Sequence, residues 1–256
     1  MDSVLLETRG LHRSFGGVHA VQDVSFKLRE GHIKAVIGPN GAGKTTLFNL
    51  IAGTLPPDEG EVFFRKERIT GRKPHAVAAR GIARTFQTTK LFPHMSVVEN
   101  MMVGRHTQTR AGFVAGMLNL PTTWREDRQA RDRCFEILAR LNLSAFAGET
   151  ASNLPFGVQR RVEFARALAM EPTLLLLDEP AAGLNIYETN ELAELIAGIR
   201  DQGVTCIVVE HDMSLVMNIS DEVLVLDQGR RIAEGPPAAI QRDPDVIRIY
   251  LGDEDA

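Results

Sequence analysis

The chain has little cysteine, no excess of basic residues and no long apolar run. Its two cysteines, Cys134 and Cys206, do not form a C-x-x-C pair, and we interpret both as small buried residues of a protein from a reducing compartment. Lys and Arg total 29 against 33 Asp and Glu, so the formal net charge of −4 does not indicate a nucleic-acid partner. Uninterrupted apolar runs stay far below the roughly 20 residues that a membrane-spanning helix needs.

The beginning of the chain also lacks the pattern of a signal peptide. Residues 1–7 include two acids, and no apolar core of the required length follows them. With 44% hydrophobic and 24% charged residues, the 256-residue chain can bury a sizeable core in one or two domains. These features predict a globular cytosolic protein without a membrane span.

What the chain does have is a glycine-rich segment between an apolar run and a predicted helix at 44–52. Residues 35–37 predict a short strand, and the spacing that follows fits the phosphate-binding pattern G-x-x-x-x-G-K-[ST]. The residues of this predicted loop are Gly38, Pro39, Asn40, Gly41, Ala42, Gly43, Lys44, Thr45 and Thr46. The order strand, glycine loop, helix argues against an ordinary glycine-rich turn.

Each residue type in this loop suits a nucleotide's phosphates. Gly41 and Gly43 carry no Cβ, so backbone N–H groups can approach phosphate oxygens at the positive end of the helix. Lys44 can neutralise the β- and γ-phosphates, and the Thr45 hydroxyl can ligate Mg²⁺. Thr46 is a candidate donor to the α-phosphate. The segment therefore predicts binding of a nucleoside triphosphate.

Two alternating segments precede this loop. The runs 4–11 and 21–28 predict antiparallel strands joined around Gly16 and Gly17. Phe15 stands at their turn, where its ring can either stack on a base or pack as an aromatic residue at a strand end. Beyond the loop, we predict a strand at 61–64, a helix at 74–80 and a strand at 82–86 that ends at Gln87.

The region 90–148 has helical signals and no strand signals. Ser96 and Glu99 form a capping-box pattern for a helix to about residue 105, and Thr123 begins a second pattern of this kind. A turn at 153–157 then leads into a predicted helix at 158–170. A helical insertion between the phosphate loop and later strands suggests a second subdomain.

Acidic residues follow two later strands. The predicted buried strand 173–177 ends in Asp178 and Glu179, and the strand 205–209 is followed by Glu210 and His211. Ligands bind at the carboxyl ends of strands in a parallel sheet. Asp178 can therefore hold the Mg²⁺ shell while Glu179 polarises an attacking water, although two adjacent acids could also form a turn. His211 is a candidate phosphate sensor at the same edge, and a structural role is its alternative.

Together these motifs resemble the complete series of an ATP-binding cassette (ABC) ATPase over nearly the whole chain. The resemblance implies an α/β fold with a P-loop core, a mostly parallel sheet, an antiparallel β lead-in and a helical subdomain. In residue numbers, 1–89 and 158–256 form the nucleotide-binding core, and 90–157 form the helical subdomain. The implied ligands are ATP and Mg²⁺.

The resemblance also assigns roles to single residues. It makes Phe15 the adenine-stacking residue, Gln87 the Q-loop residue linking Mg²⁺ and γ-phosphate to the helical subdomain, and His211 the switch histidine. It makes Glu179 the general base and residues 181–185 the D-loop, with Asn185 where many members carry Asp. The signature that completes the other subunit's ATP site would be Leu154, Pro155, Phe156, Gly157 and Val158, so the serine of the usual L-S-G-G-Q is missing.

Finer motifs resemble the larger ATPase subunit of branched-chain amino acid importers. They are the segments 83–87, 98–100, 181–185 and 209–213, with the insertion after Gly104. This resemblance implies two transmembrane permease subunits, a second cassette that is non-identical or a copy, and an extracytoplasmic binding protein. It implies a peripheral position on the cytoplasmic face of the plasma membrane.

Other classes remain as alternatives. The same cassette type serves urea or amide uptake, and related ATPases drive lipid export. A soluble ABC ATPase of DNA repair or ribosomes fits less well, because the chain has neither heptad repeats nor a second phosphate loop. A small GTPase fits least, because no N-K-x-D motif is present.

Overall fold

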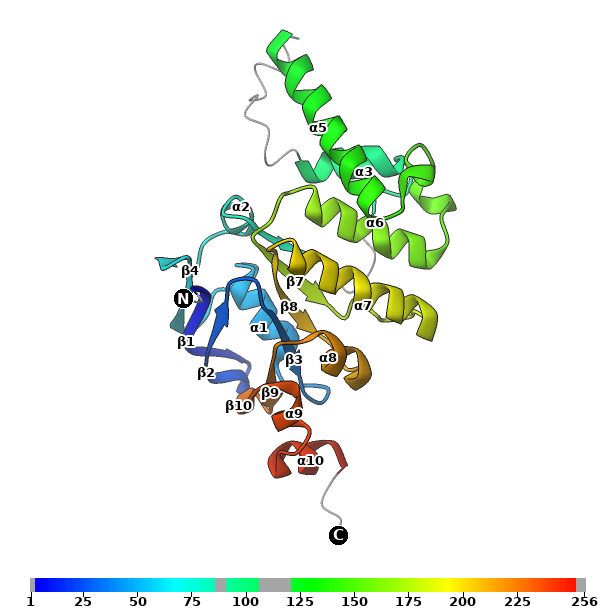
Figure 1. Cartoon of the computed structure of the whole chain (residues 1–256). Helices are drawn as coiled ribbons and strands as arrows, with labels where there is room; N and C mark the ends of the chain where they lie inside the picture. The colour runs from blue at the N-terminus through cyan, green and yellow to red at the C-terminus, as the bar shows by residue number, and fades with distance from the viewer. Residues whose placement is uncertain (1–2, 86–90, 106–120, 252–256) are drawn as a thin grey trace. The chain divides into compact units, whose positions relative to one another are not determined.

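The computed structural model describes the backbone of residues 3–85, 91–105 and 121–251. It contains two compact units, which we call the core unit (Met1–Arg84 and Thr173–Ala256) and the helical unit (Thr85–Pro172). Figure 1 shows the elements of both units along the chain.

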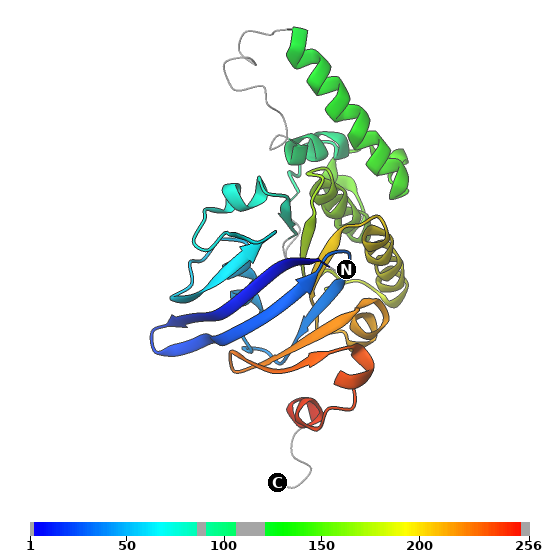
Figure 2. The same cartoon turned by 60° about the vertical axis from the view of Figure 1, so that its left-hand side comes forward.

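The smaller sheet of the core unit has four strands in the order β2-β1-β4-β5. These strands are β1 (Val4–Phe15), β2 (Val18–Arg29), β4 (Glu59–Phe64) and β5 (Glu67–Arg68), and neighbouring strands are antiparallel. Gly16 and Gly17, with φ of 52° and 89°, form the turn between β1 and β2. The predicted antiparallel lead-in is confirmed, and Figure 2 shows its long hairpin in blue.

The larger sheet has six strands in the order β10-β9-β3-β8-β7-β6. They are β3 (Ile33–Ile37), β6 (Ile82–Arg84), β7 (Leu174–Asp178), β8 (Thr205–Val209), β9 (Glu222–Asp227) and β10 (Arg230–Gly235). Every pair in this sheet is parallel except β9 with β10. All residues of β3, β7 and β8 are buried, as expected for strands covered on both faces.

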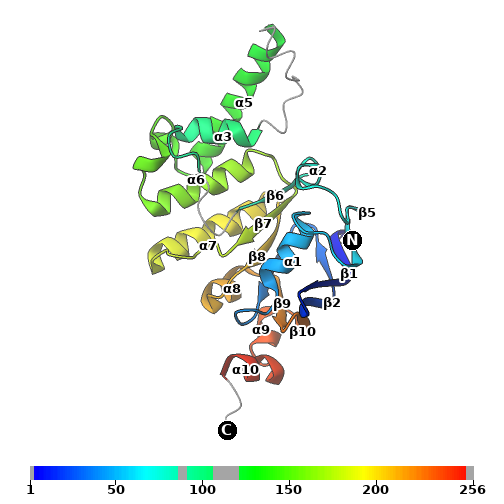
Figure 3. The same ribbon diagram turned by 180° about the vertical axis from the view of Figure 1, so that it is seen from behind.

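Helices of the core unit cover the two faces of this sheet. They are α1 (Lys44–Ile51), α2 (Pro74–Ala78), α7 (Ile186–Asp201), α8 (Met213–Ile219), α9 (Pro237–Ile240) and α10 (Pro244–Leu251). Val36 packs in one cluster with Phe48 of α1 and with residues of β1 and β2. Its neighbours Ala35 and Ile37 face a second cluster with residues of α8 and α10. Figure 3 shows α1 lying between the larger sheet and the hairpin of β1 and β2.

The helical unit is built from α3 (Val97–Arg105), α5 (Pro121–Arg140) and α6 (Phe156–Leu168), with short 3₁₀ turns between α5 and α6. The predicted capping box is present, because the Ser96 N–H donates to Glu99 Oε2 at 2.7 Å and the Glu99 N–H donates to Ser96 Oγ at 3.3 Å. Asn100 is fully buried and bonds the backbone of Phe92 through both its amide oxygen and nitrogen.

Two helix starts in this unit differ from the sequence prediction. Helix α5 begins at Pro121, so Thr123 lies inside the helix instead of capping it. Helix α6 begins at Phe156, two residues before the predicted start at Val158, because Pro155 takes the N-cap position with extended backbone. Pro is compatible with this position because a helix start needs no N–H donor there. The helix packs against α3 and α5, so it belongs with the helical unit, whereas the predicted domain boundary placed it in the core.

The part of the chain that the structure describes contains no helix with the length and apolar character needed to cross a membrane.

Candidate functional site

The predicted phosphate loop connects β3 to α1, and two kinds of local constraint, backbone angle and close packing, act on its glycines. Gly38, Gly41 and Gly43 have φ of 150°, 82° and 96°, which disfavour side chains. A Cβ on Gly38 would lie 2.1 Å from the Leu226 carbonyl oxygen, and one on Gly43 would lie 2.1 Å from the Ala20 carbonyl oxygen. A Cβ on Gly41 would meet no heavy atom within 4 Å, so its backbone angle is the constraint. Packing within the protein therefore requires glycine at positions 38 and 43, whether or not a phosphate binds.

Lys44 is the first residue of α1, and its side chain returns over the loop. Its Nζ donates to the Gly38 carbonyl at 2.7 Å and to the Pro39 carbonyl at 3.0 Å, and the residue is 8% exposed. Burial lowers the pKa of Lys44, while the negative carboxylates of Glu179 and Asp178 act in the opposite direction.

The start of α1 offers further donors. Its N-cap residue, Gly43, has a left-handed backbone and provides no side-chain cap, so the first N–H groups of the helix have no intrahelical acceptor. Thr45 is exposed and Thr46 is half-buried in this first turn. Backbone donors, a positive helix end and the Lys44 ammonium form a cradle whose chemistry suits phosphate oxygens.

The register of the parallel strands brings the predicted residues to one edge. Val209 at the end of β8 pairs with Val36 of β3 on one side and with Asp178 of β7 on the other. The phosphate loop, the Asp178-Glu179 pair and the Glu210-His211 pair thus leave three adjacent strands at the same end. This is the sheet edge at which doubly wound folds bind ligands.

Asp178 is the more deeply buried of the two acids. Its side chain is 5% exposed, and its Oδ2 accepts a hydrogen bond from Arg84 Nη2 at 2.8 Å. The same guanidinium donates through Nη1 to Asn49 Oδ1 of α1 at 2.6 Å. Carboxylate and hydroxyl oxygens are ligands that Mg²⁺ accepts, so Asp178 and Thr45 fit a magnesium shell completed by phosphates and water.

Glu179 occupies a strained turn directly after β7. Its φ is 46°, a left-handed value that costs free energy for a residue with a side chain. The backbone holds it there: its N–H donates to the Val209 carbonyl at 2.9 Å, and its carbonyl accepts from the Ala182 N–H at 3.1 Å. Its side chain is half-buried. Because of this left-handed backbone, the Glu179 side chain does not continue the alternation of side-chain directions along β7.

Glu210 was not assigned a role by sequence reasoning, yet it organises this edge. The residue is 1% exposed, and its Oε1 accepts the Ala181 N–H at 2.8 Å. Its Oε2 accepts the His211 N–H at 3.0 Å and lies 3.8 Å from His211 Nδ1. Glu210 therefore joins the segment after Glu179 to His211, whose side chain remains 67% exposed. An acid directly after a buried strand was the available signal.

The remaining predicted residues are Phe15, Gln87 and the signature residues 154–158. Phe15 is the last residue of β1 and is 44% exposed, with the Arg13 guanidinium carbon 4.9 Å from its ring centroid. Gln87 lies outside the described residues. In the helical unit, Leu154 is 7% exposed and Phe156 is 46% exposed. Because α6 starts at Phe156, the N–H groups of Phe156, Gly157 and Val158 belong to its first turn.

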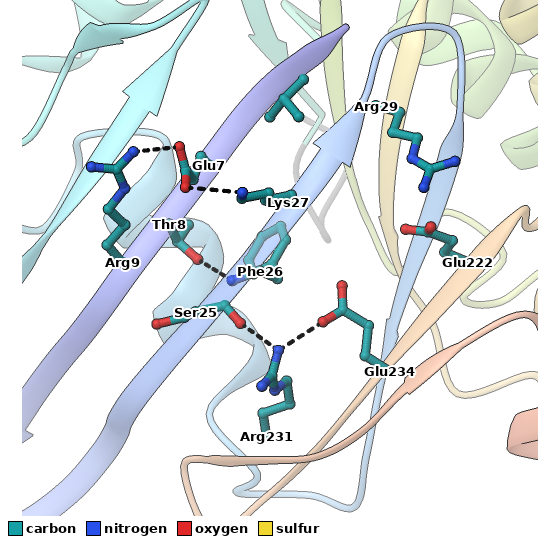
Figure 4. Close-up of a pocket in the computed structure, with 11 residues that line it drawn as sticks. Glu7, Thr8, Arg9, Ser25, Phe26, Lys27, Arg29, Glu222, Arg231 and Glu234 are labelled. Atoms are coloured by element: carbon teal, nitrogen blue, oxygen red, sulfur yellow. Dashed lines mark hydrogen bonds and ion pairs between the residues drawn. The ribbon is translucent and has the colours of Figure 1, made fainter. Parts of the chain in front are cut away.

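A separate pocket of about 780 Å³ lies along β1, β2 and the β9–β10 hairpin (Figure 4). Its charged side chains are paired with one another: Glu7 contacts Arg9 at 2.8 Å, and Arg231 contacts Glu234 at 2.9 Å. Behind them, the fully buried Lys34 ammonium contacts Glu222 at 2.8 Å and also bonds Glu234. These pairs link the strands of the core unit, and we assign no ligand to the pocket.

Comparison with known proteins identifies the family of this chain. Residues 21–182 match the family model described as ABC transporter, and the chain belongs to this family of ATP-binding cassette ATPases. Residues 230–256 match a second model, described as branched-chain amino acid ATP-binding cassette transporter. The resemblance stated from the motifs is thereby confirmed.

Particular relatives extend this match to the whole chain. The chain is 46% identical over 254 residues to the high-affinity branched-chain amino acid transport ATP-binding protein LivG of Salmonella typhimurium, covering 99% of this chain and 100% of that protein. A crystal structure of a nucleotide-free ATP-binding cassette from an ABC transporter matches with a TM-score of 0.86 at 31% identity, covering 98% of this chain and 100% of that one. The ADP conformation of such a cassette matches with a TM-score of 0.85 at 31% identity and the same coverage. The predicted ABC ATPase fold is therefore confirmed.

Proposed function

We propose that this chain is the ATP-hydrolysing subunit of an importer for branched-chain amino acids. The supporting observation is its 46% identity to LivG along the full length of both chains, together with the match of residues 230–256 to the branched-chain amino acid cassette model. An ABC core alone serves many substrates, whereas a match that includes the C-terminal segment narrows the class of transporter.

In this proposal the phosphate loop binds the ATP phosphates. Lys44 exchanges its contacts with the Gly38 and Pro39 carbonyls for the β- and γ-phosphates, and the N–H groups of residues 44–46 donate to phosphate oxygens. Thr46 donates to the α-phosphate. Phe15 stacks on the adenine, which its exposed ring at the end of β1 permits. Asn40 and Ala42 complete the loop between the glycines.

Hydrolysis is assigned to the acids that follow β7. Glu179 accepts a proton from the attacking water, and its fixed backbone keeps the carboxylate outside the strand. Asp178 and Thr45, with Gln87, would hold Mg²⁺, which would supply positive charge to offset that of the phosphates. His211 contacts the γ-phosphate. The Glu210 carboxylate positions His211 by accepting a hydrogen bond from the His211 backbone N–H.

A second cassette completes the site, because the signature that encloses the γ-phosphate comes from the facing subunit. Exposed apolar side chains support such a contact: Ile186 is 73% exposed and Tyr187 is 80% exposed, directly after the D-loop segment 181–185. Two permease subunits and an extracytoplasmic binding protein form the rest of the importer. The chain then acts at the cytoplasmic face of the plasma membrane, where loss of γ-phosphate contacts changes its shape through Gln87 and the helical unit.

Uptake measurements test this assignment. In the source cell, deletion of the gene is expected to abolish high-affinity uptake of labelled leucine, isoleucine or valine. The wild-type gene should restore that uptake, and a Glu179→Gln gene should not. After mild solubilisation, two permease proteins and a second cassette are expected to co-purify with the chain. Loss of urea, amide or lipid transport with unchanged amino acid uptake would contradict the proposed substrate.

Pro155→Ser tests the departure of this chain from the usual signature. Pro155 supplies neither a hydroxyl nor an N–H, so we expect the substitution to speed hydrolysis at the partner's phosphate loop by about 3- to 10-fold, the value of one hydrogen bond. Single-turnover hydrolysis is measured in complexes whose catalytic Glu is removed from one subunit at a time. Pro155→Ala restores the N–H without the hydroxyl and serves as the control. In the wild-type complex we expect the site on this chain's own phosphate loop to hydrolyse ATP faster than the partner's site, which this signature completes. Equal rates at both sites would contradict that expectation.

A further inference from the structure

Arg84 lies at the end of β6, beside the acid that follows the neighbouring strand. Its side chain is 13% exposed, and the side chain of Asp178 is 5% exposed, so the pair is largely removed from water. Nη2 donates to Asp178 Oδ2 at 2.8 Å, and Nη1 donates to Asn49 Oδ1 at 2.6 Å. Two nitrogens of the guanidinium thus donate to acceptors on two different elements.

These two contacts connect the halves of the proposed nucleotide site. Asn49 lies in α1, whose first residue is Lys44, while Asp178 ends β7. The guanidinium is planar and rigid, so holding both acceptors keeps the helix and the carboxylate in one relative geometry. Its carbon also lies 5.9 Å from the centroid of the Phe48 ring, which packs beneath it in α1. A lysine carries a single ammonium and cannot reproduce this fork.

The contact also determines which oxygen of the acid is engaged. Arg84 bonds Oδ2 of Asp178, and this bond fixes the rotation of the carboxylate and thereby the direction of Oδ1. An unpaired carboxylate at this burial would be costly, and a freely rotating one would present its oxygens to a metal in many orientations. Loss of a partner that orients a metal ligand typically costs about 10- to 100-fold in metal affinity or activity.

We propose that Arg84 is a positioning residue of the nucleotide site, which orients Asp178 for the magnesium shell and ties it to the phosphate-loop helix through Asn49. This inference rests on the proposed role of Asp178 as the acid of the magnesium shell. It predicts that replacing Arg84 weakens the contribution of magnesium to ATP binding more than it weakens ATP binding without metal.

The experiment measures ATP affinity of the full chain with Mg²⁺ and with EDTA, using a fluorescent ATP analogue. In Arg84→Met the tightening caused by Mg²⁺ is expected to fall about 10-fold or more, while affinity in EDTA changes less than about 2-fold. Arg84→Lys is expected to keep part of the tightening by Mg²⁺. Asn49→Ala is expected to reduce this tightening about 3-fold, because the Arg84 guanidinium loses one of its two acceptors and is held less firmly. Arg200→Met is the matched control, since Arg200 pairs with Asp201 at 2.9 Å and Asp221 at 3.6 Å away from the phosphate loop.

The outcomes separate this inference from the proposed function. If wild type shows no tightening by Mg²⁺, or if Asp178→Asn retains it, the magnesium assignment of Asp178 is wrong. If wild type shows tightening and Arg84→Met retains it in full, the role of Arg84 is wrong. An equal loss with Mg²⁺ and with EDTA would show a structural ion pair only and would also overturn the inference. If Arg84→Met does not fold, Arg84→Lys and Asn49→Ala decide by the same comparison.

Discussion

Replacing Lys44 by alanine is expected to lower the ATPase activity of the reconstituted complex at least about 100-fold, because it removes the cation proposed for the β- and γ-phosphates. The site already positions this charge: Nζ lies 2.7 Å from the Gly38 carbonyl oxygen and 3.0 Å from that of Pro39, within the loop itself. Tight ATP binding is expected to be lost with hydrolysis. Binding of a fluorescent ATP analogue and phosphate release measure the two effects.

The control for this change is Lys27→Ala. Lys27 has a 64% exposed side chain on β2 and contacts Glu7 at 3.7 Å, so its removal changes net charge by the same amount outside the phosphate loop. Its ATPase activity is expected to stay within about 2-fold of wild type, since surface ion pairs contribute little. Thermal unfolding of both variants separates loss of the site from loss of the fold. Normal ATPase activity in folded Lys44→Ala would contradict the phosphate-loop assignment.

Replacing Glu179 by glutamine is expected to slow hydrolysis about 100-fold or more while ATP binding is retained. The amide has nearly the same size as the carboxylate, but it cannot accept a proton from the attacking water. The backbone bonds of Glu179 to Val209 and Ala182 do not involve the side chain, so the turn itself should persist. Single-turnover hydrolysis and ATP affinity, measured on one sample, show whether only the chemical step changes.

Glu194→Gln is the matched control for this experiment. Glu194 is exposed on α7 of the same unit, and the substitution makes the same chemical change away from the sheet edge. It is expected to leave turnover unchanged. If Glu179→Gln turned over at a near-normal rate, the proton would go elsewhere, and His211 would become the next residue to test because Glu210 holds it at the same edge.

Several elements of this protein could be predicted from local sequence because local chemistry determines them. The turn at Gly16 and Gly17 needs left-handed backbone, and the box of Ser96 and Glu99 satisfies helix N–H groups within four residues. The buried strand 205–209 was predicted with its observed bounds from a short apolar run. The run 223–226 has the same character, so the signal for β9 was present although the strand was not predicted.

Other features had no local signal. The polar segment that forms β10 becomes a strand by pairing antiparallel with β9, since its own residues show little alternation. The early start of α6 depends on Pro155 taking the N-cap, whereas the sequence favoured a turn there. Gly43 illustrates a mixed case: the motif predicted glycine for a phosphate, and the fold adds the carbonyl of Ala20 at 2.1 Å from any Cβ.

Local sequence was sufficient to identify the class of protein and the residue types of its proposed site, because the spacing of Gly38, Gly43 and Lys44 and the acids after buried strands reflect contacts within a few residues. The contacts by which these segments support one another could be found only in the folded chain. Glu210 bonds Ala181 from 29 positions away, and Arg84 reaches Asn49 and Asp178 across 35 and 94 positions. Strand order and register in the sheet determine such partners, and the sequence between two partners gives no signal that they will meet.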